Sequence, residues 1–152
     1  MFTQAKKIFV VGLLAVLMTS CAGHKMMTSK SLYNRLGGKA AIEAVVEDFV
    51  GRLATDSRIK NEKVGARFAV IHVPSLKTHL VNLICQGAGG PCKYTGRDMK
   101  SSHAGLAITS AEFGFVVDDL VAALNKFNVP KKEQEEVLAL LGPMQKDIVE
   151  TN

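Results

Sequence analysis

The sequence has few aromatic residues and only a small excess of positive charge. Aromatic side chains make up 6% of the 152 residues, and the formal net charge is +5. The basic residues are scattered along the chain, and tyrosines and phenylalanines are not interleaved with arginines. Proteins that bind DNA or RNA usually carry a basic patch, often combined with aromatic stacking platforms. We therefore expect no nucleic-acid partner.

Two other patterns are absent. No stretch of useful length alternates between apolar and polar residues, as a half-buried strand would. No GxGxxG run occurs, so nothing in the chain predicts binding of a nicotinamide or flavin cofactor. Instead, apolar residues recur at intervals of three and four, and 47% hydrophobic residues are enough to fill one core. The sequence predicts a single all-α domain.

The first twenty residues resemble an export signal. Lys6 and Lys7 precede an apolar run at 8–18, which is too short to span a bilayer and is typical of a signal-peptide core. The run Leu17-Met18-Thr19-Ser20-Cys21 resembles a bacterial lipobox, in which the cysteine is lipidated after cleavage. The alternative is an ordinary signal peptide with an incidental cysteine.

The lipoprotein interpretation divides the chain into three parts. Residues 1–20 are the signal peptide, 21–30 a polar tether and 31–150 the folded domain, and loss of the signal peptide lowers the net charge to +3. Cys21 would then anchor the protein to a membrane of the bacterial cell envelope, facing the periplasm. Ala22, rather than aspartate, follows the cysteine, which favours the outer membrane by analogy with lipoprotein sorting.

Helical periodicity is clear in the first half of the domain. Ser31 is a suitable cap for a short helix that Gly37-Gly38 ends. A long helix is expected from Lys39, and a further helix is expected to restart at Pro74 with Ser75 as its cap. The segment 56–73 between them is the least regular. The apolar faces of these helices comprise Leu32, Tyr33 and Leu36, then Ile42, Val45, Val46, Phe49 and Leu53, and finally Leu76, His79, Leu80 and Leu83.

The second half continues this pattern. Thr109 and Glu112 have the spacing of a capping box that opens a long helix. Residues 128–130 break that helix, and a last helix with a bend at Pro143 follows. The two apolar faces comprise Phe113, Val116, Val117, Leu120 and Leu124, and then Val137, Leu140, Leu141, Met144 and Ile148.

The most informative stretch is 89–106. Gly89, Gly90 and Pro91 force a loop, and Met99, His103 and Leu106 then fall at i, i+4 and i+7 on one apolar face of a short helical run. A histidine in such a position is either a core residue or a ligand. This run resembles the loop and proximal-histidine helix of the truncated haemoglobins, and His103 matches the haem-iron ligand of that family.

The resemblance to group 1 truncated haemoglobins covers residues 31 to about 149. It includes both glycine pairs, the run Tyr94-Thr95-Gly96-Arg97-Asp98-Met99 and the run His103-Ala104-Gly105-Leu106. It implies a two-over-two helical sandwich around haem b. The implied pocket residues are Phe49, Phe68, Leu76, His79, Leu80, Leu83, Ile84, Met99, Ile108, Phe113 and Val116, with Phe68 on the porphyrin face.

The distal side departs from the usual pattern of the family. Val50 stands where many members have a tyrosine that holds bound O2, and Leu80 where a glutamine is common. His79 is the one basic nitrogen expected on this apolar side, so it is a candidate sixth ligand to the iron; the alternative is a histidine at the edge of the distal helix. His72 is a weaker candidate for the same role.

The implied function is reversible binding of O2, NO or CO rather than catalysis. NO dioxygenase or peroxidase activity would need an external electron-donor protein. The competing interpretation is a haem-free helical envelope lipoprotein that acts as a structural or binding module, with His103 in its core.

Two cysteines remain besides Cys21. Cys85 and Cys92 do not form CxxC, and no CxxCH occurs, so covalent attachment of a c-type haem is not expected. An envelope location would permit a disulfide between them. Equally, they could be two small buried hydrophobic residues.

Overall fold

The computed structural model describes residues 30–59 and 62–151. Across these two ranges all regular structure is helical, and extended backbone pairs only in an isolated bridge between Thr109 and Thr151. The all-α prediction is confirmed. The predicted signal peptide, Cys21 and most of the tether lie outside the described residues. The helices are α1 (Leu32–Arg35), α2 (Gly38–Thr55), α3 (Glu62–Val70), α4 (Val73–Gly87), α5 (Met99–His103), α6 (Ser110–Lys126), α7 (Lys131–Leu141), the 3-10 turn η1 (Gly142–Met144) and α8 (Gln145–Ile148).

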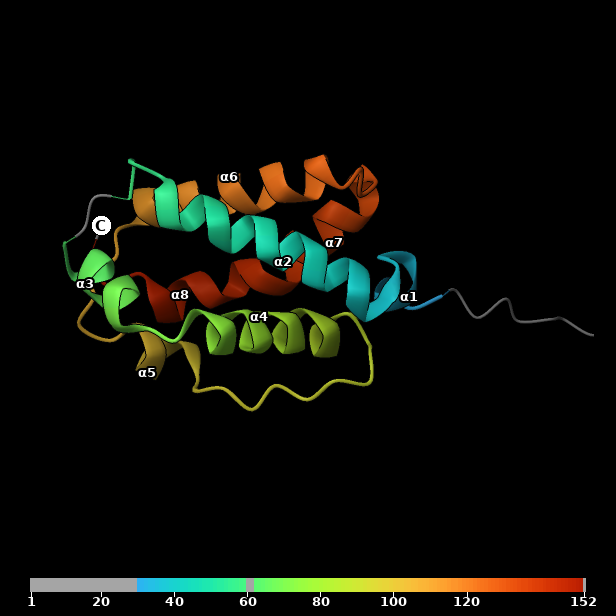
Figure 1. Ribbon diagram of the computed structural model, residues 1–152, viewed down its shortest axis with the longest axis horizontal. Coiled ribbons are helices and arrows are strands. Elements are labelled where there is room, and N and C mark those ends of the chain that lie inside the picture. The colour runs from blue at the N-terminus through green and yellow to red at the C-terminus, as the bar shows by residue number, and fades with distance from the viewer. Residues whose placement is uncertain (1–29, 60–61, 152) are drawn as a thin grey trace, which may run out of the picture.

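The helix α2 is central in the arrangement. It packs along α4 on one side and along α6 on the other, and α7 contacts both α4 and α6 (Figure 1). Two helix pairs, α2 with α4 and α6 with α7, therefore stack on each other. The core between them consists of buried apolar side chains from all four helices: Ile42, Val45, Val46, Phe49, Val50, Val81, Ile84, Cys85, Leu120, Ala123, Leu124 and Val137.

The predicted helix ends are mostly found. Ser31 Oγ accepts a hydrogen bond from the Asn34 N–H at 3.3 Å and caps α1. Thr109 and Glu112 form the expected capping box at the start of α6, because each side chain accepts from the backbone N–H of the other. Such reciprocal bonds satisfy two N–H groups that a helix start leaves unpaired.

Three local predictions are wrong. The segment 56–73 is not irregular throughout, because α3 occupies Glu62–Val70, with Val64 and Phe68 at i and i+4 on its half-buried side. The helix α4 begins at Val73 with His72 as its N-cap, so Ser75 lies inside the first turn, where its Oγ is 2.8 Å from His72 Nδ1. Pro74 is tolerated there because the first turn needs no N–H donor.

The third error concerns the helix that carries His103. It ends at His103 and does not continue to Leu106, because Gly105 and Ala107 adopt φ angles of +78° and +52°. Leu106 is nevertheless buried. The expected bend at Pro143 is a full break, since α7 ends at Leu141 and a 3-10 turn follows.

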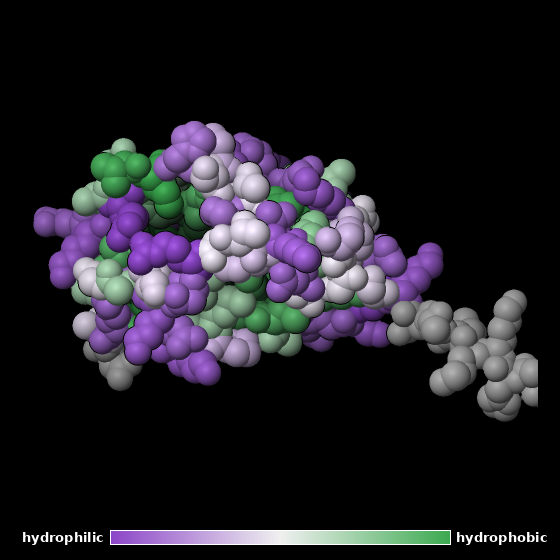
Figure 2. Space-filling view, turned by 90° about the horizontal axis from the view of Figure 1, so that it is seen from below, coloured by the Kyte–Doolittle hydropathy of each residue, from purple (hydrophilic) through white to green (hydrophobic). Residues whose placement is uncertain are grey.

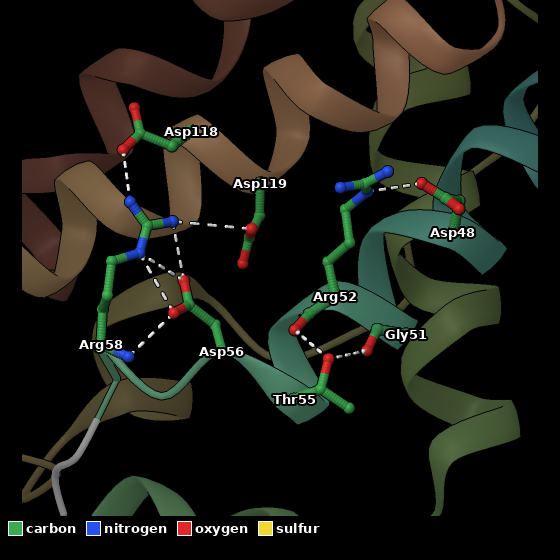
Figure 3. Close-up of polar contacts among 8 residues, drawn as sticks. All are labelled: Asp48, Gly51, Arg52, Thr55, Asp56, Arg58, Asp118 and Asp119. Carbon is green, nitrogen blue, oxygen red and sulfur yellow. Dashed lines mark hydrogen bonds and ion pairs between the residues drawn. The ribbon is translucent and has the colours of Figure 1, made fainter.

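A cluster around Arg58 ties the segment that follows α2 to the helix α6 (Figure 3). The guanidinium lies 2.8 Å from Asp56 and 2.9 Å from Asp118, with Asp119 at 3.7 Å and the Phe115 ring centroid at 4.7 Å. Hydrogen bonds from Arg58 lower the pKa of Asp56, whereas burial and then the neighbouring Asp56 carboxylate raise the pKa of Asp119. The chain that leads from α2 toward α3 is thereby held against α6.

Candidate functional site

His103 is the last residue of α5 and is held in one tautomer. Asp98 caps the helix by accepting from the Ser101 N–H at 2.8 Å and from Ser101 Oγ at 2.6 Å, and these bonds lower the Asp98 pKa. His103 Nδ1 lies 2.7 Å from the Met99 carbonyl oxygen. A carbonyl can only accept, so Nδ1 carries the hydrogen and the lone pair of the neutral ring is on Nε2. This is the arrangement of a metal-binding histidine.

His79 lies on α4, as predicted, and is half-buried. Its Nδ1 is buried and has no hydrogen-bond partner. The ring meets Tyr94 edge-on, with centroids 6.0 Å apart and planes at 73°. A buried polar nitrogen without a partner is unfavourable, so this ring is suited to a group that the polypeptide does not supply.

Tyr94 is a site residue to which sequence reasoning gave no role. Its N–H donates to Gln86 Oε1 at 2.7 Å, and its hydroxyl donates to the Arg97 carbonyl at 2.5 Å. Burial and the Asp98 carboxylate raise its pKa. Tyr94 belongs to a run that resembles the family, but its spacing from His79 in the sequence predicts no contact between the two rings.

Most side chains assigned to the pocket lie outside the buried core, although Leu76, Leu80 and Val116 pack against it. All of them except Phe49 and Ile84 are only half-buried, whereas Phe49 is 7% exposed and belongs to the core of α2. Figure 2 shows apolar atoms gathered around a hollow toward the end of the molecule where α3 and α5 lie. Apolar surface of this kind suits a flat hydrophobic cofactor. The half-buried set consists of Phe68, Leu76, His79, Leu80, Leu83, Met99, Ile108, Phe113 and Val116.

Two other cavities lie away from the histidines. One, of about 420 Å³, is an open groove between α2 and the end of α6 that includes Asp48, Arg52 and Lys126. The second, of about 160 Å³, is lined almost wholly by apolar side chains of the core, including Val45 and Leu124. Neither is lined by His79 or His103.

The structure joins Cys85 and Cys92 in a disulfide. This decides between the two alternatives left open for these cysteines. Cys85 lies on the buried side of α4, and Cys92 lies two residues before Tyr94 in the loop that leads to α5. The bridge therefore holds the start of this loop against α4.

Two negative findings apply to residues 30–59 and 62–151. These residues contain no group of three or more His, Cys, Asp or Glu placed to hold a metal ion. None of their helices is by itself long and apolar enough to cross a membrane; α3 and α4 meet that criterion only when counted together, and a bend of 102° separates them.

A model of the bacterial-like globin family matches residues 31–150. The chain belongs to this family. Its similarity to group 1 truncated haemoglobin GlbN of Mycolicibacterium paratuberculosis is 36% identity over 118 residues, covering 78% of this chain and 83% of the relative. GlbN of Synechocystis sp. is 32% identical over 116 residues, covering 74% and 90%. These relatives place the globin in the group 1 truncated haemoglobins.

Solved structures agree with the globin fold. The 2/2 haemoglobin of Synechococcus sp., in the cyanomet state with covalently attached haem, has a TM-score of 0.69 and 29% identity over 79% of this chain and 98% of that chain. Truncated haemoglobin of Tetrahymena pyriformis has a TM-score of 0.71 at 23% identity, over 79% and 98%. The predicted two-over-two sandwich is confirmed, and haem is the cofactor of this globin. The free Nε2 of His103, the orphaned nitrogen of His79 and the half-buried apolar wall fit that cofactor.

Proposed function

We propose that this globin binds diatomic gases through haem held by His103 as the proximal ligand. The observation that carries the proposal is the hydrogen bond from His103 Nδ1 to the Met99 carbonyl, because it leaves Nε2 with a free lone pair at the end of α5. When bound, haem supplies an iron centre whose sixth coordination position accepts O2, NO or CO. A haem-free structural lipoprotein is the less favoured alternative, since the family and the apolar wall both fit haem.

Absorption spectra of the ferric, ferrous and CO-treated protein test this proposal. We expect a Soret band in the wild type, and we expect His103→Ala to lose haem unless imidazole is added. His72→Ala is the matched control, because His72 is exposed and contacts Ser75 at the start of α4. An unchanged spectrum and haem affinity in His103→Ala would refute the assignment.

We further propose that His79 takes the sixth position in the absence of gas. Val50 is buried in the core and Leu76 and Leu80 are apolar, so the distal side offers few other donors. A gas must then wait for His79 to leave, and its binding rate should approach a limit that does not depend on gas concentration. The ferrous spectrum should be low-spin in the wild type and high-spin in His79→Leu. A high-spin ferrous wild type would leave His79 as an edge residue.

We propose that Cys21 carries a lipid anchor and that the globin lies in the bacterial cell envelope. The Cys85–Cys92 disulfide supports an oxidising compartment, because disulfides rarely persist in the cytosol. Cys21→Ser should move the protein from the membrane fraction to the soluble fraction and leave the haem spectrum unchanged. Wild-type protein that is soluble and free of lipid by mass spectrometry would contradict the proposal.

Turnover of a gas or peroxide would require a partner. The chain has no nicotinamide- or flavin-binding motif, so repeated NO dioxygenation or peroxide reduction would draw electrons from a separate donor protein. Gas binding without turnover needs no such partner and is the function we favour.

A further inference from the structure

The helix that carries His103 is too short to hold its own position. It has five residues, and a helix of that length gains too few internal hydrogen bonds to be stable alone. Its start is fixed by the Asp98 cap. Its end is His103 itself, so the position of the imidazole, which the Met99 bond orients within the helix, depends also on the packing of α5 against α8 and on whatever holds the residues that follow.

Those residues adopt an unusual backbone. Gly105 has φ +78° and Ala107 has φ +52°, and the second value is uncommon for a residue with a side chain. Such a conformation persists only where the surroundings hold it in place. The surroundings here come from the C-terminal end of the chain.

The Glu150 carboxylate holds this loop with both of its oxygens. Oε1 accepts from the Gly105 N–H at 2.7 Å and Oε2 accepts from the Ala107 N–H at 2.6 Å, across 45 and 43 residues of sequence. The backbone adds further bonds, since the N–H groups of Glu150 and Thr151 donate to the Ile108 carbonyl at 2.9 and 3.2 Å. Hydrogen bonds to an ionised carboxylate are among the stronger ones in proteins.

We propose that Glu150 is a positioning residue for the proximal histidine. Its carboxylate locks the left-handed loop after His103, and this lock fixes where α5 ends and how the imidazole Nε2 is directed. The inference rests on the proposed role of His103 as the iron ligand. It assigns to the C-terminal segment a function in the haem site, although that segment follows the last helix and contributes no predicted pocket residue.

Glu150→Gln is the discriminating variant. An amide has only one acceptor oxygen, and its NH2 group cannot accept, so at most one of the two N–H bonds survives. Asp147→Asn is the matched control, because it removes the same charge from an exposed side chain of α8, directly before that segment. Both are made in full-length, haem-loaded protein.

Two measurements are made on these variants. One is the rate at which ferric protein loses haem to an excess of a haem scavenger. The other is the iron–histidine stretching frequency from resonance Raman spectra of ferrous protein, recorded with His79→Leu in every sample so that His79 does not bind the iron. We expect Glu150→Gln to lose haem about tenfold faster, because removal of a group that supports a metal ligand typically lowers metal affinity at least tenfold. We also expect its stretching frequency to shift, and Asp147→Asn to change neither quantity.

A purely structural role gives a different result. If Glu150 only stabilised the fold, Glu150→Gln would lose haem faster through unfolding but would keep the wild-type stretching frequency, and that outcome overturns the proposal. Amide hydrogen exchange in the wild type gives a test that does not depend on whether the variant folds. The Gly105 and Ala107 amides should be protected, and fast exchange of both would also overturn it.

The His103→Ala arm separates this inference from the function on which it rests. If His103→Ala loses haem and imidazole restores it, but Glu150→Gln matches the wild type, then ligation by His103 stands and positioning by Glu150 is wrong. If His103→Ala keeps the wild-type spectrum, both assignments fall.

Discussion

Replacement of Gly90 by alanine should destabilise the fold because its backbone touches two neighbours. A Cβ at this position would lie 2.5 Å from Tyr33 Cδ2, 2.7 Å from Cys85 Sγ and 2.8 Å from the Cys85 carbonyl oxygen. The Tyr33 ring could shift, but Cys85 is buried and is tied to Cys92 by the disulfide. The Gly90 N–H also donates to the Cys85 carbonyl at 2.8 Å, so the clash would strain this bond as well. Overpacking of this kind costs about 1–3 kcal/mol.

Urea unfolding followed by circular dichroism measures the effect, on ferric haem-loaded protein at a fixed haem concentration. Gly87→Ala is the matched control, since its Cβ would meet Leu140 at 3.5 Å, an ordinary contact, at the last residue of α4. Alanine in place of a helical glycine gains about 0.5–1 kcal/mol. The two variants should therefore move the free energy of unfolding in opposite directions. If Gly90→Ala is as stable as the wild type, the close approach at Gly90 is not a constraint.

Three further predictions concern stability. Reduction of Cys85–Cys92, which closes a loop with a sequence separation of 7, should lower the free energy of unfolding by about 2.5 kcal/mol in the chain-entropy description, and Cys92→Ser should not respond to reductant. Thr109→Ala should cost about 1 kcal/mol through loss of the α6 cap, and an unchanged thermal midpoint would contradict this. The raised pKa of Asp119 means that the folded state binds its proton more tightly than the unfolded state, so the contribution of Asp119 to stability should fall as pH rises from 3.8 through that raised pKa. Asp119→Asn should not show that fall in unfolding titrations at several pH values.

The sequence predicted the helices where local signals were strong. Ser31 and the Thr109–Glu112 pair cap helices because a side-chain oxygen meets a backbone N–H only a few residues away, and such contacts follow from spacing alone. Prediction failed at α3, where charged residues and Gly65 obscured a short apolar repeat. It also failed after His103, where the direction of the chain depends on contacts with a distant segment.

The same distinction between local and distant contacts applies to the candidate site. The hydrogen bond from His103 to the Met99 carbonyl spans only four residues, so it follows from local helix geometry. The contact of Tyr94 with His79 and the clamp by Glu150 cross 15 residues or more, and neither leaves a periodic trace in the sequence. A carboxylate that binds backbone N–H groups recognises no particular side chain, so only the fold reveals it.

Different contacts position the two histidines, and Tyr94 links them. Along α4, the Cys85–Cys92 disulfide fixes the loop, and the Gln86–Tyr94 hydrogen bond holds the tyrosine against His79. The two ends of α5 are held by the Asp98 cap and the Glu150 clamp. The Tyr94 hydroxyl donates to the carbonyl of Arg97, the residue before Asp98, so disturbance of the disulfide should alter the surroundings of His79 and also reach the start of α5. The Glu150 clamp joins other residues at the opposite end of α5, and interactions without shared partners act almost independently. The clamp should therefore persist when the disulfide is reduced.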